Sequence, residues 1–147
     1  MKGQVSTELL VIVALVLLLF IPLLVLVYFK ANEANQQIGT YQAELAVSRM
    51  ASLANSVGSL GTNTSVVTDI YIPPNTLSFS IKESGSAGGE AVLQISTPQG
   101  KSEVVDLIRY PLSNPGDIPV TPGTWMRVNI SSEYSNADQA HIKIEKV

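Results

Sequence analysis

Residues Leu9–Phe29 have the sequence LLVIVALVLLLFIPLLVLVYF, a run of 21 residues without a charged side chain. At ~1.5 Å per residue, a helix of this length spans roughly 31 Å, close to the ~30 Å hydrocarbon core of a bilayer. Pro22 removes one helical hydrogen bond, so we expect a kink near Phe20 to Pro22. Tyr28 and Lys30 close the run with an aromatic ring and a cation, as at a membrane interface. The stretch therefore predicts one membrane-spanning helix.

The composition outside this run is that of an ordinary polar chain. Of the 147 residues, 46% are hydrophobic and only 14% are charged, an imbalance that residues 9–29 create. The net charge of -3 is spread without long blocks, which argues against a nucleic-acid partner. The chain has no cysteine, which removes disulfides, thiolate catalysis and cysteine metal sites. A protein with a single membrane segment is the expected class.

The residues before the apolar run are unusual for a membrane helix. Lys2 supplies a cation, and Glu8 places a carboxylate directly before the N-terminal end of the apolar run, where burial of a charge costs several kcal/mol. No small-residue cleavage motif follows Phe29, which argues against an ordinary secretory signal. In a plain signal anchor, Glu8 would be a cytoplasmic residue and Ser6 or Thr7 would be the N-cap of the helix.

The order Gly3-Gln4-Val5-Ser6-Thr7-Glu8-Leu9, followed by an apolar stretch, resembles the class III signal peptide of archaeal type IV pilin-like precursors, with its Q-x-S-x-E-L pattern. The resemblance covers about the first 29 residues. It implies that residues 1–3 form a leader, which a membrane-embedded aspartic prepilin peptidase removes by cutting between Gly3 and Gln4. Glu8 would then be the fifth residue of the mature chain, where type IV pilins carry a glutamate.

The resemblance also implies partners for this segment. Cleavage would create an α-amino group at Gln4, with a reference pKa of ~7.7–8.0, and its charge would neutralise the Glu8 carboxylate of a neighbouring subunit. Such a buried pair adds little net stability but sets register, because breaking it leaves one charge uncompensated. The implied partners are other copies of the chain in a homopolymer, the peptidase, and an assembly platform with its ATPase.

The helix is expected to continue beyond the apolar run, over residues 4–61. Residues 30–60 contain no proline and are rich in alanine, glutamine and glutamate. Gly39 is a weak point within them, and Gly58, Gly61 and Asn63 predict the helix end. Apolar residues recur at helical spacing in this segment and form one stripe: Ile38, Tyr41, Leu45, Ala46, Met50, Leu53, Val57 and Leu60. We expect this stripe to pack against a folded domain, with a separate coiled coil as the alternative.

Residues 65–147 change to a two-residue period, which predicts β-strands. Alternation is regular at residues 77–81, 93–95, 126–130 and 142–144, and weaker at 66–72 and 103–109. Pro98-Gln99-Gly100 predicts a tight turn between two strands. The expected fold is α+β: a long N-terminal helix followed by an antiparallel β-sandwich head. The resemblance to archaeal pilin-like subunits implies that this head is immunoglobulin-like.

The head contains no predicted catalytic or metal site. His141 is the only histidine, on the polar face of the last strand, and no carboxylates have metal-loop spacing. We therefore expect neither an enzyme nor a cofactor. Trp125 is interpreted as a core anchor, with an exposed adhesive residue as the alternative. Asn63 and Asn129 begin N-x-S/T sequons and are candidate N-glycosylation sites if the head is extracellular.

Two hypotheses for function follow from this organisation. The first is a structural subunit of a type IV pilus-like surface filament, held in the cytoplasmic membrane as a precursor and then polymerised with its head outside. The second is a membrane-anchored minor pilin or surface binding module, for example one that mediates adhesion. The same leader serves both kinds of protein, so the sequence leaves them open.

Overall fold

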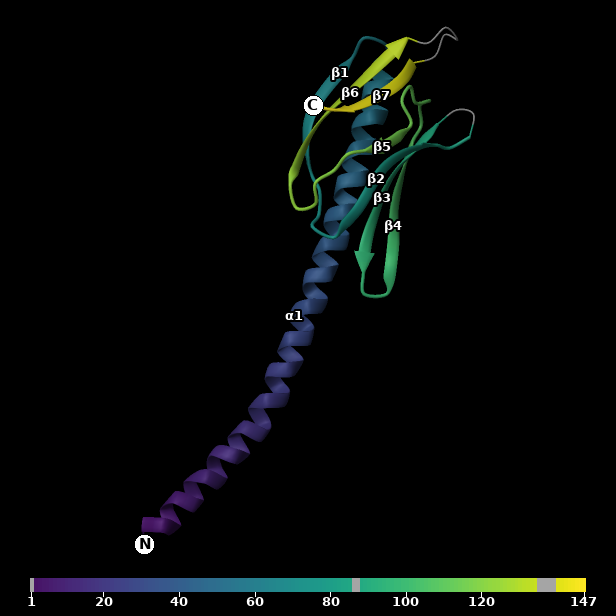
Figure 1. The fold of residues 1–147 in the computed structure, drawn as a ribbon. Helices are drawn as coiled ribbons and strands as arrows, with labels where there is room; N and C mark the ends of the chain where they lie inside the picture. Colours follow the sequence, from purple (N-terminus) through teal and green to yellow (C-terminus); the bar gives the residue numbers. More distant parts are fainter. Residues whose placement is uncertain (1, 86–87, 135–139) are drawn as a thin grey trace. The chain divides into compact units, whose positions relative to one another are not determined.

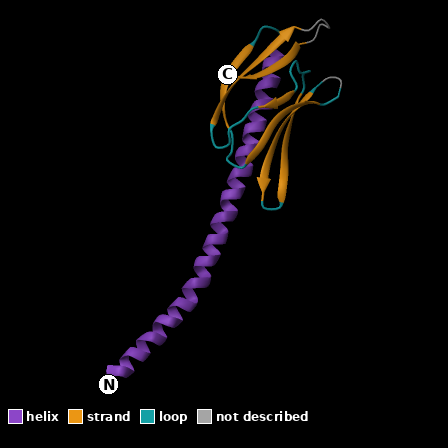
Figure 2. Ribbon diagram, in the orientation of Figure 1, coloured by secondary structure: helices purple, strands orange, loops and turns teal. Residues whose placement is uncertain are grey.

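The computed structural model describes residues 2–85, 88–134 and 140–147. The chain forms two compact units, an N-terminal unit of residues 1–37 and a C-terminal unit of residues 38–147. Helix α1 (Lys2–Leu60) belongs in part to each unit, and all the strands lie in the C-terminal unit (Figure 1, Figure 2).

Helix α1 is close to the predicted helix over residues 4–61. It continues through Pro22 without interruption and ends at Leu60. Gly61 follows with a φ of 93°, a left-handed conformation that favours glycine, and its amide donates to the carbonyl of Gly58 (3.4 Å). Because α1 begins at Lys2, Ser6 lies inside the helix. The suggestion that Ser6 or its neighbour Thr7 caps the helix is therefore wrong.

The strands form two antiparallel sheets in the part of the chain that the structure describes. The three-stranded sheet has the order β1-β6-β7, and the four-stranded sheet has the order β4-β3-β2-β5. The predicted α+β class, a long N-terminal helix followed by an antiparallel β-rich head, is confirmed. The strands are β1 (Ser65–Tyr71), β2 (Thr76–Glu83), β3 (Gly89–Thr97), β4 (Gly100–Ile108), β5 (Gly116–Ile118), β6 (Trp125–Tyr134) and β7 (Ala140–Lys146).

Each predicted strand corresponds to an observed one, and one strand was not predicted. Strand β5 has three residues, too few for alternation to be visible, and it pairs with Phe79–Ile81 of β2. The predicted tight turn is confirmed, since Thr97 pairs with Gly100 across Pro98-Gln99 and Gly100 has a φ of 127°. Turn-forming residues at 84–89 and 135–138 also separate predicted strands in the sequence; residues 135–138 and the centre of 84–89 lie outside the described residues.

The core joins the second half of α1 to both sheets. The helix contributes mainly small side chains: Ala43, Ala46, Val47, Met50, Ala51, Ala54 and Val57. This confirms packing of the helix against the head. The predicted stripe, however, was partly wrong, because Ile38, Tyr41, Leu45 and Leu60 are 52%, 66%, 68% and 71% exposed. The two sheets lie against the alanine-rich face of the helix, which leaves the larger side chains of the neighbouring face outside.

Two asparagine side chains close exposed sheet edges. Asn55 of α1 donates from Nδ2 to the Leu107 carbonyl (3.1 Å) and accepts from the Arg109 amide (2.7 Å), so its amide acts as a partner for β4. Asn114 makes the same pair of bonds to the carbonyl and amide of Ile144 in β7 (2.8 and 3.0 Å). Both contacts occupy backbone groups that would otherwise offer a template for strand addition.

Candidate functional site

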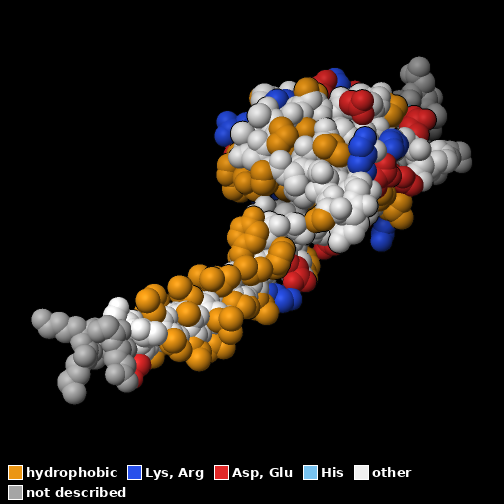
Figure 3. Space-filling model, turned by 60° about the horizontal axis from the view of Figure 1, so that its bottom comes forward, with side chains coloured by type: hydrophobic (Ala, Val, Ile, Leu, Met, Phe, Trp, Pro, Cys, Tyr) orange, Lys and Arg blue, Asp and Glu red, His pale blue; other side chains and the backbone are white. Residues whose placement is uncertain are grey.

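The first candidate site is the apolar surface of α1 in the N-terminal unit. From Leu9 to Phe29, every residue except Ala14 and Pro22 is a large apolar side chain between 44% and 71% exposed. Figure 3 shows one face of this segment as an almost continuous apolar surface. Full burial of one such side chain stabilises by ~1.5–3 kcal/mol, so leaving the whole run in water would cost on the order of 20–40 kcal/mol. The segment is long and apolar enough to cross a membrane.

Glu8 stands at the start of this surface. It is exposed and lies beside Thr7, Val11 and Ile12 on α1. The helix also includes Gly3 and Gln4, whose side chains lie outside the described part of the structure. Because Gln4 and Glu8 are four residues apart in one helix, their backbone positions lie on the same face, about one turn apart. The pairing of these two positions between neighbouring subunits stays a prediction.

The position of Glu8 in the helix favours a negative charge. A carboxylate one turn from the end of a helix is favourably placed, since the first backbone N–H groups of a helix have no intrahelical acceptor. If the chain began at Gln4, Glu8 would occupy this place, and a new ammonium group would lie in its neighbourhood. Inside an apolar assembly each of these opposite charges needs the other, or an equivalent group from a second copy.

A second cluster of exposed apolar side chains lies on the C-terminal unit. Trp125 is 66% exposed, and its ring lies 5.4 Å from the ring of Tyr71, its cross-strand partner. The prediction that Trp125 anchors the core is therefore wrong. Met126, the next residue of β6, is 3% exposed and points inward, so strand parity places Trp125 on the outer face of the three-stranded sheet. The alternation that predicted β6 already contained this information.

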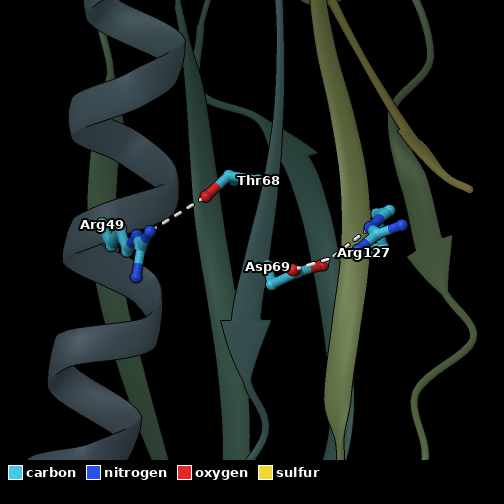
Figure 4. Close-up of polar contacts among 4 residues, drawn as sticks. All are labelled: Arg49, Thr68, Asp69 and Arg127. Atoms are coloured by element: carbon cyan, nitrogen blue, oxygen red, sulfur yellow. Dashed lines mark hydrogen bonds and ion pairs between the residues drawn. The ribbon is translucent and has the colours of Figure 1, made fainter.

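Polar contacts fix the helix and the first two strands of this sheet beside the aromatic pair (Figure 4). Arg49 of α1 donates to Thr68 Oγ1 of β1 (3.0 Å). Asp69, on the other side of β1, accepts from Arg127 Nε of β6 (2.9 Å). The hydrogen bond from Arg127 lowers the pKa of Asp69 below its ordinary value, and the charges of Arg127 and Arg49 add to this effect. The same bond raises the pKa of Arg127.

Within the described residues, no group of three histidine, cysteine, aspartate or glutamate side chains is arranged to hold a metal ion. His141 is half-buried in β7 opposite Glu133, which confirms its interpretation as a strand residue. Lys143, two residues on, forms ion pairs with Glu145 (2.9 Å) and Glu133 (3.4 Å). Its pKa is raised, first by the hydrogen bond to Glu145 and then by the charges of Glu133 and Glu145.

The two sequons occupy different environments. Asn63 is exposed in the connection between α1 and β1, with a φ of 62°. Asn129 lies in the middle of the central strand β6, paired with Val67 on one side and Glu145 on the other, and its Oδ1 is enclosed without a hydrogen-bond partner. An enzyme therefore has easier access to Asn63 in the folded head.

The fold and this surface define a class of protein: an N-terminal apolar helix, able to anchor in a membrane, followed by a β-rich head. No protein-family model, curated protein or solved structure matches this chain.

Proposed function

We propose that this chain is a structural subunit of an archaeal type IV pilus-like surface filament. The precursor is held in the cytoplasmic membrane by residues 9–29, and a prepilin peptidase cuts it between Gly3 and Gln4. An assembly platform with its ATPase then moves the subunit into a filament, where α1 packs against α1 of other copies. The head lies outside the cell.

The observation that carries this proposal is Glu8 at the start of the exposed apolar surface. A helix that only anchors a protein needs the apolar run of Leu9–Phe29, and an acidic group before that run adds no more than a modest interaction with the helix N-terminus. A helix that is buried among its own copies needs the same run together with a device that fixes its axial position. Glu8 and the amino group created at Gln4 supply such a device, and this favours assembly over simple anchoring.

The local structure around the scissile bond is compatible with cleavage. The bond between Gly3 and Gln4 lies in the first turn of α1, where backbone N–H groups have no intrahelical acceptor. Glycine lowers helix stability by about 1 kcal/mol relative to alanine. Opening the chain for a peptidase is therefore less costly at Gly3 than inside the apolar run.

The proposal is tested by the variant Glu8→Gln in the cells that make the protein. It keeps the size and hydrogen-bonding capacity of the side chain and removes its charge. We expect normal amounts of processed chain in the membrane and loss of surface filaments. Electron microscopy of material sheared from the cell surface measures the filaments. The matched control is Glu33→Gln, which removes a carboxylate of the same helix that forms an exposed ion pair with Lys30 (2.7 Å).

The outcomes separate the two functional hypotheses. Filament loss in Glu8→Gln but not in Glu33→Gln supports the register role. Normal filaments in both variants contradict it. If the unmodified chain is found only in the membrane and never in filaments, the protein is an anchored surface module and the proposal is wrong.

A further inference from the structure

The head has an exposed surface whose chemistry suits a protein partner. We define the aromatic patch as Tyr41, Leu45, Tyr71 and Trp125. Tyr41 and Leu45 are neighbours on α1, and they are 66% and 68% exposed. A shallow groove joins Leu45 to the aromatic pair of Tyr71 and Trp125. These side chains therefore form one apolar surface across the helix and the three-stranded sheet.

The groove is lined mainly by carbon. Ala46 and Ile70 also line the groove, and its polar lining comes from Gln42 and Arg49. The guanidinium of Arg49 already donates to Thr68. A carbohydrate needs several hydrogen-bonding groups directed into its site, whereas an apolar side chain of another protein needs only such a groove. The lining therefore favours a protein partner.

The size of the patch indicates what kind of contact it makes. Trp and Tyr side chains bury ~150–250 Å² each, so the exposed parts of the patch amount to roughly 400 Å². A stable interface between two proteins takes about 800 Å² from each partner. The patch is therefore too small to hold a dimer by itself. It is sufficient for a contact between subunits that another surface, such as α1, already holds together.

A complementary surface lies on the outer face of β4. Val105 and Leu107 are 46% and 59% exposed and share this face with Glu103. Glu103 accepts a hydrogen bond from the neutral amide of Gln94 (2.6 Å). On this face the cross-strand register places three carboxylates, Glu90, Glu103 and Asp117, together with Lys82 and Lys101, so the face is only slightly acidic. The apolar side chains of Val105 and Leu107, with the Glu103 carboxylate beside them, match an apolar patch that has Arg49 at its rim.

We propose that the aromatic patch of one copy packs against the outer face of β4 of the next copy, with Arg49 facing Glu103. The two surfaces are different, so the contact is heterologous and repeats from copy to copy, as an open filament requires. This inference rests on the proposed function, because α1 supplies the main attachment between subunits. The head contact then adds direction and specificity to the assembly.

Cysteine cross-linking tests the contact directly, because the natural chain has no cysteine. We would place Leu45→Cys and Leu107→Cys in one full-length chain and treat isolated filaments with a short bis-maleimide. The contact predicts a ladder of covalent multimers on a denaturing gel. Each single variant should remain monomeric. The control pair, Leu45→Cys with Lys146→Cys, places the second thiol on exposed β7 and should give no ladder.

Each other result has a defined meaning. Dimers from Leu45→Cys alone would show that the patch packs on itself and would overturn the contact. Filaments whose double variant gives no ladder would also overturn it, as expected if the patch takes a carbohydrate or another protein, and they would leave the assembly proposal standing. Absence of filaments from the unmodified chain would overturn both.

Charge reversal gives an independent test of the same orientation. Arg49→Glu would place two carboxylates opposite each other, so we expect about tenfold fewer subunits in filaments. Glu103→Arg should have a similar effect, and the double variant should return the yield to within about twofold of the unmodified chain. The thermal unfolding of the membrane-held chain, measured in parallel, shows whether the head remains folded. Additive losses in the double variant would contradict the pairing.

Discussion

Gly58, near the end of α1, gives a sharp test of how the helix packs against the head. It is buried, and a Cβ built on it would lie 2.6 Å from Cγ and Cε2 of Tyr110 and in closer contact with Cδ2. Ordinary carbon contacts are ~3.5–4.0 Å, so Gly58→Ala forces the ring to move by about 1 Å. Overpacking of this kind costs about 1–3 kcal/mol, against a gain in helix stability of about 0.5–1 kcal/mol. The net effect is destabilisation by up to about 2.5 kcal/mol.

The same substitution should have the opposite sign once the ring is removed. Tyr110→Ala destabilises the head, because its half-buried side chain packs against the core. In that background Gly58→Ala meets no ring, so only the gain in helix stability of about 0.5–1 kcal/mol remains. Gly39→Ala is the matched control on the same helix, since the atoms nearest to its Cβ would be those of the Asn75 side chain, at 3.1–3.3 Å.

The assay is thermal unfolding of the full chain in detergent, followed by circular dichroism. Each kcal/mol corresponds to a change in Tm of about 4–8 °C for a domain of roughly this size. We expect Gly58→Ala to lower the Tm in the natural background and to raise it in the Tyr110→Ala background. A rise in both backgrounds would refute the reasoning, because it would mean that the ring does not lie over Gly58.

Three further predictions concern the head. Met50→Ala removes a fully buried side chain and should lower the free energy of unfolding by about 2–5 kcal/mol in urea denaturation; a change below 0.5 kcal/mol would contradict the described core. The pKa of Asp69 is lowered, so its pair with Arg127 stabilises the head above the ordinary pKa of 3.8, and this contribution disappears as the pH falls through the lowered value. Asp69→Asn should therefore be less stable than the natural chain at pH 7, and equal stability at both pH 7 and pH 2 would contradict this. Peptide mass spectrometry of the native chain should find an N-glycan at Asn63 and none at Asn129, and the reverse pattern would contradict the accessibility argument.

Much of the fold was predictable because its signals are local. The run of residues 9–29 needs no tertiary information to be identified as an exposed apolar helix, and Glu8 is visible beside it. The predicted strands were found because one face of each is buried, which imposes a two-residue period on the sequence. Strand β5, with three residues, was missed because it is too short to show a period.

What could not be predicted depends on how separate elements meet. The helix between Ile38 and Leu60 has apolar residues on more than one face, and the sequence alone favoured the larger ones for the core. In the structure the sheets approach the alanine-rich face, because close packing of a helix against two sheets favours small side chains, with Met50 as the largest that the helix contributes. Leu45 is left exposed for this reason. The groove beside it depends on residues from three elements, so no local pattern indicates it.

The central claim is that the chain is cut before Gln4 and uses the new amino group together with Glu8. Mass spectrometry of the intact chain and its N-terminal peptide, isolated from surface filaments, tests this most directly. The account predicts a chain that begins at Gln4 and carries a protonatable α-amino group. A filament chain that begins at Met1, or one that begins at Gln4 with a blocked and uncharged terminus, would contradict it.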